Sequence, residues 1–254
     1  MQEYMTINCG GRLLSLERAL VMGIVNLTPD SFYADSRYCF NACHDADIVD
    51  IGACSTRPGG VQCAEEEEIT RLKEALPQIL EHTEGKIKSI DTYRPAVAEY
   101  AIEAIGVDII NDISGGSDEM FDIAASERKA YVLTYPEGGG VSEMMLWFSK
   151  KVDMLARKGV ADIILDPGIG FGKEAERNME IIRDLPALKT MGLPVLCGVS
   201  RKSVIYKTLN ITPEEALNGT TALNTILLEK GADILRVHDA REALEAVKLY
   251  ELTR

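Results

Sequence analysis

The sequence predicts one α/β domain over residues 1–254, a (β/α)8 TIM barrel with an N-terminal β-hairpin closing its bottom. Eight short apolar runs recur along the chain, and amphipathic helical stretches lie between most of them. No linker, low-complexity tract or internal repeat divides the chain. Eight βα units with right-handed crossovers close into a barrel, whereas a doubly wound sheet typically uses five or six.

The hairpin is predicted over residues 4–16. Apolar and polar residues alternate there on both sides of Gly10 and Gly11, and paired glycines are typical of a tight hairpin turn.

The predicted strands are continuous apolar runs rich in β-branched residues, as expected for parallel strands covered on both faces. They span residues 21–26, 47–52, 87–91, 107–112, 130–134, 162–166, 194–199 and 233–237. Helices are predicted at 66–81, 96–105, 144–158, 179–191, 214–230 and 240–251, among others. Glycines after these helices are expected to form left-handed caps, namely Gly85, Gly106, Gly159, Gly192 and Gly231.

Composition limits the classes of function. The chain is 46% hydrophobic and 26% charged, it has no apolar run of 18 residues, and its first residues lack a basic-then-apolar signal. We therefore expect a soluble, cytoplasmic protein. The net charge of −13 argues against nucleic acid or an anionic membrane as a partner, but it is compatible with a small anion held by local cations.

Six cysteines are present, and none forms a C-x-x-C pair. In a cytoplasmic protein such thiols are expected to be reduced. A metal cluster of Cys39, Cys43 and His44 is disfavoured, because no second ligand pair follows at zinc-finger spacing.

Polar residues stand at or just past the end of every predicted strand. They are Asn26, Asp50, Asp91, Asn111, Thr134 or Tyr135, Asp166, Ser200 with Arg201 and Lys202, and Arg236 with His238. Taken singly, Asp91 or Asp166 could cap the next helix and Asn111 could close a turn. In a barrel, however, all these strand ends meet on one face, which is where barrel active sites lie.

Two loops carry more specific information. Residues 55–60, S-T-R-P-G-G, place hydroxyl groups and the Arg57 guanidinium beside a turn, which suits phosphate oxygens. Residues 166–173, D-P-G-I-G-F-G-K, do not form a Walker loop, because the glycine spacing differs and Glu174 replaces Ser or Thr; G-x-G-x-x-G is also lacking. The glycines favour close approach of a flat ligand, with Phe171 as an apolar wall.

Seven motifs follow one another between about residue 20 and residue 240: M-G-I-V-N-L-T-P-D-S-F, D-I-G-A-C-S-T-R-P-G, S-I-D-T, I-N-D-I-S-G, D-P-G-I-G-F-G-K, G-V-S-R-K-S and R-V-H-D. In this order they resemble the dihydropteroate synthases, a family of pterin-binding enzymes. The resemblance implies a homodimeric transferase of folate (tetrahydrofolate) biosynthesis. Such an enzyme condenses 6-hydroxymethyl-7,8-dihydropterin diphosphate with 4-aminobenzoate, releases diphosphate with Mg²⁺, and is the target of sulfonamides, which mimic 4-aminobenzoate.

The resemblance also implies roles for individual residues. The pterin would contact Asp91, Asn111, Asp166 and Lys202, with Phe171 beside it. The diphosphate would contact Arg57, Arg236, His238 and a Mg²⁺ held by Asn26. The 4-aminobenzoate would lie in a slot of Phe32 and Pro58, with Thr56 and Ser200 near its carboxylate and Lys202 nearby. Asp30 and Asp50 would hold the first two loops and Arg57, and the catalytic set would be Lys202, Arg57, Asp91 and Asp30.

The sequence departs from the family pattern in two places. Thr134-Tyr135-Pro136 stands where the family usually has a His-Met pair and a longer loop, and only 14 residues separate Phe32 from Asp47. So short a crossover predicts at most about two helical turns there. Two alternative functions stay open. One is a methyltransferase that acts on methyltetrahydrofolate and a corrinoid protein; such an enzyme has no use for a diphosphate-binding site. The other is a non-catalytic pterin-binding paralogue.

Overall fold

The strands form a closed barrel. The computed structural model describes residues 4–28, 40–54 and 63–253. Its eight parallel strands are hydrogen-bonded in the order β8-β7-β6-β5-β4-β3-β10-β9. The ring closes where Leu165 of β8 forms a parallel bridge with Val195, just before β9, and the Leu165 N–H donates to the Pro194 carbonyl at 2.8 Å. The predicted barrel is therefore confirmed.

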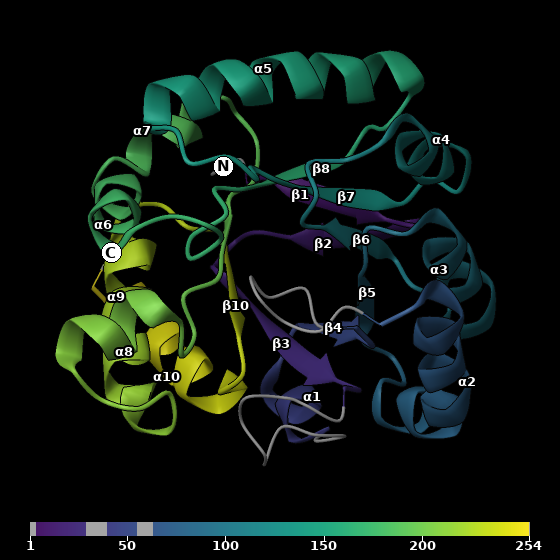
Figure 1. Cartoon of the computed structure of the whole chain (residues 1–254), viewed down its shortest axis with the longest axis horizontal. Coiled ribbons are helices and arrows are strands. Elements are labelled where there is room, and N and C mark those ends of the chain that lie inside the picture. The colour runs from purple at the N-terminus through teal and green to yellow at the C-terminus, as the bar shows by residue number, and fades with distance from the viewer. Residues whose placement is uncertain (1–3, 29–39, 55–62, 254) are drawn as a thin grey trace.

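The helices surround the strands in chain order (Figure 1). The strands are β3 Leu20–Asn26, β4 Ile48–Gly52, β5 Ile87–Asp91, β6 Ile109–Asp112, β7 Ala130–Thr134, β8 Ile163–Asp166, β9 Leu196–Cys197 and β10 Ile234–Val237. The helices are α1 Asn41–Asp45, α2 Glu65–His82, α3 Pro95–Tyr100, α4 Asp118–Ser126, α5 Val141–Lys158, α6 Ala175–Arg183, α7 Pro186–Lys189, α8 Ser203–Leu209, α9 Leu217–Glu229 and α10 Ala240–Glu251, with a π-turn η2 Ala101–Ile105 and a 3₁₀ turn η3 Glu214–Ala216. The helix predicted at 179–191 is divided into α6 and α7, and the one at 96–105 ends in the π-turn. All five predicted glycine caps have positive φ, between 70° and 96°.

The hairpin closes the end of the barrel where the strands begin. β1 Thr6–Cys9 pairs antiparallel with β2 Arg12–Ser15, and Gly10 and Gly11 between them have φ of 60° and 94°, as a type I′ turn requires. The buried side chains of Ile7 and Cys9 pack against the first inward-facing residues of the barrel strands, such as Leu20. The prediction that the hairpin closes the bottom is confirmed.

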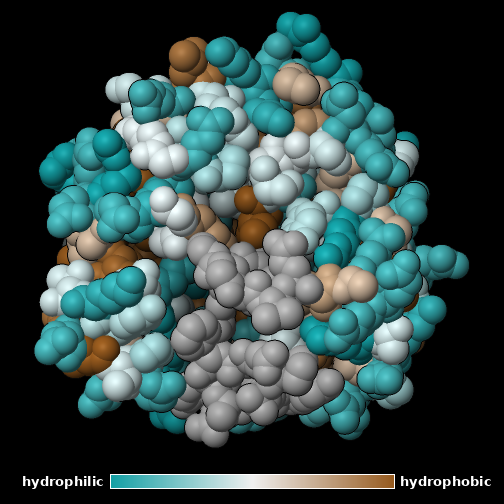
Figure 2. Space-filling model, in the orientation of Figure 1, coloured by the Kyte–Doolittle hydropathy of each residue, from teal (hydrophilic) through white to brown (hydrophobic). Residues whose placement is uncertain are grey.

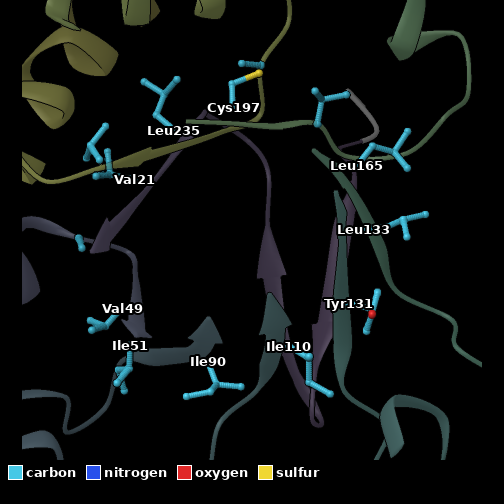
Figure 3. Packing of buried hydrophobic residues seen from close by; sticks show 14 of the residues in the cluster. Val21, Val49, Ile51, Ile90, Ile110, Tyr131, Leu133, Leu165, Cys197 and Leu235 are labelled. Atoms are coloured by element: carbon cyan, nitrogen blue, oxygen red, sulfur yellow. The ribbon is translucent and has the colours of Figure 1, made fainter. Parts of the chain in front are cut away.

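Side chains along each barrel strand point alternately outward, toward the helices, and inward, into the barrel. Val49, Ile51, Ile90, Ile110 and Leu133 belong to the cluster between strands and helices, and they lie around the outside of the ring (Figure 3). The residues between them face inward, because successive side chains of a strand point to opposite faces. Inside the ring an apolar residue is followed two positions later by a polar one. These pairs are Ile48 and Asp50, Ile109 and Asn111, Ile164 and Asp166, and Ile234 and Arg236. The interior of the barrel is therefore polar toward the carboxyl ends of the strands and apolar toward the ends where the strands begin.

The first crossover contains the five-residue helix α1, which packs directly on β3. A Cβ added at Gly23 would lie 2.9 Å from the Ala42 carbonyl oxygen and 2.9 Å from the Ala46 Cβ. A helix so close to the strand shortens the return path, which suits the few residues available. The prediction of at most about two helical turns agrees with α1. For residues 33–39, which lie outside the described residues, it stays a prediction.

Replacing Gly23 tests this close packing. Gly23→Val should lower the free energy of unfolding by about 2 kcal/mol, because the new side chain meets the backbone of α1. For a chain of this size the melting temperature should fall by about 6 °C. Gly138→Val is the matched control, since a Cβ there meets nothing within 4 Å among the described residues. Equal melting temperatures for the two variants would contradict the packing argument.

Candidate active site

An arginine and two aspartates join three strands inside the barrel. The Arg236 Nε donates to Asp50 Oδ2 at 2.6 Å, and its Nη2 donates to Asp91 Oδ2 at 2.6 Å. Asp50 is fully buried and Asp91 is 4% exposed. Burial raises the pKa of Asp91 to about 7, and the Arg236 charge opposes this only in part. One cation facing two carboxylates leaves a cluster that favours a ligand with donors or positive charge.

Asn111 of β6 extends this cluster. Its Nδ2 donates to Asp50 Oδ2 at 3.0 Å, while its Oδ1 has no hydrogen-bond partner among the described residues. The side chain is almost fully buried. A buried carbonyl oxygen without a donor costs free energy, so each such atom in a folded protein calls for a reason. An N–H group of a bound ligand would supply the missing donor.

Asp166 at the end of β8 is a further buried acceptor. Its Oδ1 accepts the Gly168 N–H at 2.8 Å, and its Oδ2 accepts the Thr134 hydroxyl at 3.5 Å. Burial raises the pKa of Asp166, and the nearby Lys202 charge opposes the rise. Thr134, in the region where the sequence departs from the family pattern, therefore supports the acceptor Asp166 by donating a hydrogen bond to it.

Lys202, which follows β9, reaches the loop after β8. Its Nζ donates to the Ile169 carbonyl at 2.6 Å and lies 4.4 Å from the centroid of the Phe171 ring, within the range of a cation–π contact. A Cβ at Gly170, whose φ is 85°, would lie only 2.7 Å from Lys202 Cδ. Glycine there leaves room for the lysine stem. Burial lowers the pKa of Lys202 to about 8, although the Asp166 carboxylate opposes this.

A second lysine supports this loop and was not singled out from the sequence. Lys173 Nζ donates to the carbonyls of Gly168 at 2.9 Å, Tyr135 at 3.3 Å and Phe171 at 3.4 Å. It thereby joins the loop to the end of β7 and keeps Phe171 beside Lys202. The sequence feature that could have identified Lys173 as a supporting residue is its position directly after the glycine-rich stretch.

Ser200 and His238 meet at the ends of β9 and β10. Ser200 Oγ lies 3.1 Å from His238 Nδ1, and the His238 backbone N–H donates to Ser200 Oγ at 3.2 Å. Between Ser200 and Lys202, Arg201 has a left-handed φ of 52° and donates from Nε and Nη2 to the Asp239 carboxylate, both at 2.9 Å. Arg201 therefore secures the turn that presents its two neighbours.

Asn26 at the end of β3 is the predicted metal ligand. A Cβ at Gly52 would lie 3.7 Å from Asn26 Oδ1 and 3.7 Å from Asp91 Oδ2. The Asn26 amide oxygen and the Asp91 carboxylate therefore both lie beside Gly52, which has no side chain. Mg²⁺ prefers six oxygen ligands and commonly takes several of them from phosphates and water. The residues present therefore fit Mg²⁺ together with a phosphate ligand, with Asn26 as one oxygen ligand.

Five predicted site residues lie outside the described residues: Asp30, Phe32, Thr56, Arg57 and Pro58. Their roles stay predictions. The described contacts of Asp50 are with Arg236 and Asn111, so Asp50 serves the buried cluster, and the predicted contact with Arg57 is not tested. Figure 2 shows a mostly hydrophilic face, with hydrophobic residues visible in separate places, one near the middle.

Buried acceptors and cations gathered at the ends of barrel strands define a (β/α)8-barrel enzyme site. The sequence model of a protein family described as "Pterin binding enzyme" matches residues 22–238 of this chain. The Clostridium beijerinckii dihydropteroate synthase is 40% identical, over 93% of this chain and 94% of that protein. The Bacillus subtilis one is 36% identical, over 92% of this chain and 88% of that protein.

Solved structures agree. The Yersinia pestis dihydropteroate synthase in a sulfonamide drug complex has a TM-score of 0.90 at 31% identity, covering 98% of this chain and 99% of that one. The Thermus thermophilus enzyme in complex with 4-aminobenzoate has a TM-score of 0.88 at 33% identity, covering 98% and 100%. This chain belongs to the pterin-binding enzyme family, among the dihydropteroate synthases.

Removing the buried cation tests the cluster. Arg236→Met should lower the free energy of unfolding by about 3–5 kcal/mol at pH 8, because two buried carboxylates lose their partner. The loss should be smaller at pH 5. Without the cation the pKa of Asp91 rises further, the folded state binds protons more readily than the unfolded state, and stability increases as the pH falls.

Urea denaturation at the two pH values measures this difference. Arg241→Met, which removes an exposed i,i+4 pair with Glu245 on α10, is the control and should change stability little at either pH. A loss for Arg236→Met that is the same at pH 5 and pH 8 would contradict the role of the carboxylates.

Proposed function

We propose that this protein is an active dihydropteroate synthase, which condenses 6-hydroxymethyl-7,8-dihydropterin diphosphate with 4-aminobenzoate to form 7,8-dihydropteroate and diphosphate. The observation that carries the proposal is the buried Asn111 Oδ1, which has no hydrogen-bond partner among the described residues. It lies at the strand ends of a chain whose relatives are dihydropteroate synthases.

The pterin fits the polar layer. One edge of a pterin ring carries adjacent N–H donors, which Asn111 Oδ1 and the carboxylates of Asp91 and Asp166 can accept. Lys202 can donate to the ring carbonyl, and Phe171 beside it offers an apolar surface to the ring. Because these side chains are fixed by their own hydrogen bonds, they orient the reactive methylene group without further reorganisation.

The reaction breaks the bond between the methylene carbon and the diphosphate oxygen and forms a bond to the amine nitrogen. We favour ionisation first, because the electron-rich pterin can delocalise the positive charge of the methylene carbon. The carboxylates of Asp91 and Asp166 stabilise that charge. The arylamine then attacks and afterwards loses its proton. An aromatic amine is unprotonated at neutral pH, so no strong general base is needed.

The diphosphate takes the negative charge of the broken bond. His238 and Arg57 would contact it, and a Mg²⁺ ion at Asn26 would neutralise part of its charge. Both described ion pairs of Arg236 go to carboxylates, so we assign it a weaker contact with the diphosphate than the sequence alone suggests.

The 4-aminobenzoate would lie between Phe32 and Pro58, with Thr56 and Ser200 near its carboxylate, and Asp30 would support the first loop. A sulfonamide would compete for the same place. The proposal includes a homodimer and a cytoplasmic location. None of the helices that the structure describes is both long and apolar enough to cross a membrane.

Diphosphate release in the presence of both substrates is the direct test. Release should require the pterin diphosphate and 4-aminobenzoate together, and a sulfonamide should inhibit it. Methyl transfer from methyltetrahydrofolate to a corrinoid, with no diphosphate release, would support the methyltransferase instead. Pterin binding without turnover would support the non-catalytic paralogue, an alternative that rests on the two shortened loops, after the first and the fifth strands.

Lys202→Met should lower kcat/KM by about 100-fold or more, because a charged contact to the transition state is lost. The melting temperature should hardly change, since the ammonium makes one described hydrogen bond, to Ile169, and the Asp166 carboxylate keeps the Gly168 N–H and the nearby charges of Arg236 and Lys173. Lys207→Met, at an exposed position on α8, the helix that begins just after Lys202, is the matched control and should have normal turnover. Normal turnover of Lys202→Met would remove this residue from the mechanism.

The pH dependence provides a second check on Lys202. The ammonium is charged below its pKa of about 8, so kcat/KM should fall about tenfold per pH unit above that value. In Lys202→Arg this fall should be absent, because the guanidinium stays charged throughout the range.

Binding of diphosphate tests the metal site by calorimetry. Mg²⁺ should tighten binding to the wild type by tenfold or more, and Asn26→Ala should lose this gain while binding diphosphate alone as before. His238→Ala should weaken binding both with and without Mg²⁺. The exposed substitution Asn218→Ala is the control and should behave as the wild type. A full Mg²⁺ effect in Asn26→Ala would place the ion elsewhere.

A further inference from the structure

Two thiols lie together outside the polar cluster. Cys54 Sγ, Cys63 Sγ and a carboxylate oxygen of Glu68 are all within 4.8 Å of one another. The Cys63 backbone N–H also donates to Cys54 Sγ at 3.1 Å. Both cysteines are free, and they are 6% and 8% exposed. None of the steps proposed for the condensation uses them.

Their positions in the chain connect them to the reaction. Cys54 comes two residues after β4 ends, and Cys63 comes two residues before α2 begins. The segment between them, residues 55–62, contains Thr56 and Arg57, which the sequence assigns to the two substrates. The thiols therefore stand at the two ends of the segment to which the proposed function assigns substrate contacts, and the inference below rests on that function.

Arg94, which precedes α3, holds Cys63 in place. Its Nη2 donates to the Cys63 carbonyl at 2.5 Å, and its Nη1 lies 3.8 Å from Cys63 Sγ and donates to the Glu68 carboxylate. A guanidinium in this position disfavours a metal cation among the same groups, although two sulfurs and a carboxylate are otherwise a plausible zinc set. The same positive charge favours the thiolate that attacks a disulfide. Burial raises the pKa of Cys63 to about 11, so the attack is slow at neutral pH.

We propose that Cys54 and Cys63 form a reversible disulfide that lowers the activity of the site under oxidising conditions. The oxidant is a low-molecular-weight disulfide. The Cys63 thiolate attacks one sulfur, forms a mixed disulfide and releases one small thiol; the Cys54 thiolate then displaces the second. The two protein thiols lose two electrons and two protons, and the oxidant gains both as two thiols.

The expected effect on activity follows from distance. A disulfide holds the two sulfurs about 2.05 Å apart, so atoms now within 4.8 Å must approach one another. The shift draws together the two ends of the segment that carries Arg57. Displacing a catalytic group by about 1 Å can cost on the order of 100-fold in rate.

The test oxidises the full-length protein with glutathione disulfide, alkylates the remaining thiols, and digests with a protease that cleaves at acidic residues. No Asp or Glu lies between Ile51 and Ala64, so both cysteines stay in one peptide. We expect that peptide to be unalkylated and two hydrogen atoms lighter than the dithiol form. Diphosphate release should fall tenfold or more, and dithiothreitol should restore both the dithiol peptide and the activity.

Cys54→Ser should keep its activity in glutathione disulfide, while Cys43→Ser, a buried thiol elsewhere, should lose activity as the wild type does. Should Cys54→Ser fail to fold, Cys63→Ala takes its place, and the wild-type peptide needs no variant. Full alkylation of both cysteines after oxidation would overturn the proposal. So would a disulfide that leaves activity unchanged, an equal loss of activity in Cys54→Ser, or zinc retained stoichiometrically after dialysis. Because the peptide is measured without substrate, failure of the disulfide is distinguishable from failure of the proposed function.

Discussion

The contact between Arg236 and the two aspartates is the constraint on which the rest of the site depends. Burying three charges is expensive, and the cost is recovered only where the geometry is good and the remaining lone pairs find donors. The barrel provides this by bringing β10, β4 and β5 to one place, and Asn111 adds β6. Losing Arg236 would leave two buried carboxylates without their partner, so the chemistry of the site depends on the strands that bring these residues together.

The apolar residues inside the barrel, at the end where the strands begin, offset the cost of burying the polar residues at the other end. Ile48, Ile109, Ile164 and Ile234 fill the lower interior together with Ile7 of the hairpin. Their strands are also covered on the outer face by the larger cluster under the helices. This burial stabilises the ring by an amount proportional to the apolar area removed from water. A ring stabilised in this way can hold buried oxygens such as Asn111 Oδ1, which finds no donor in the described part of the chain and is open to a ligand N–H.

Local patterns in the sequence predict most of the fold. The strand runs, the Gly10-Gly11 turn and the glycine caps each depend on a few neighbouring residues. The structure confirms them, although β9 covers only Leu196–Cys197 of the strand predicted at 194–199. The strand-end rule also predicted that Asp91, Asn111 and Asp166 would gather on one face. The pairing of Arg236 was beyond reach, because its partners are 186 and 145 residues away and meet it only when the barrel closes.

Burial acts in opposite directions on Lys202 and Asp166. It lowers the pKa of the lysine to about 8 and raises that of the aspartate, so both are moved toward their neutral forms. The charge of each opposes the shift of the other, and Gly168, Arg236 and Lys173 also favour the Asp166 carboxylate. A pterin that accepts from Lys202 and donates to Asp166 would satisfy both groups without water between them. Because the cost of burying the pair is met during folding, it does not have to be met again when the ligand binds or when charge develops on the methylene carbon. Burying Lys202 and Asp166 costs stability. It also leaves a donor and an acceptor in fixed positions, and these favour a ring that has an acceptor and donors on neighbouring edges.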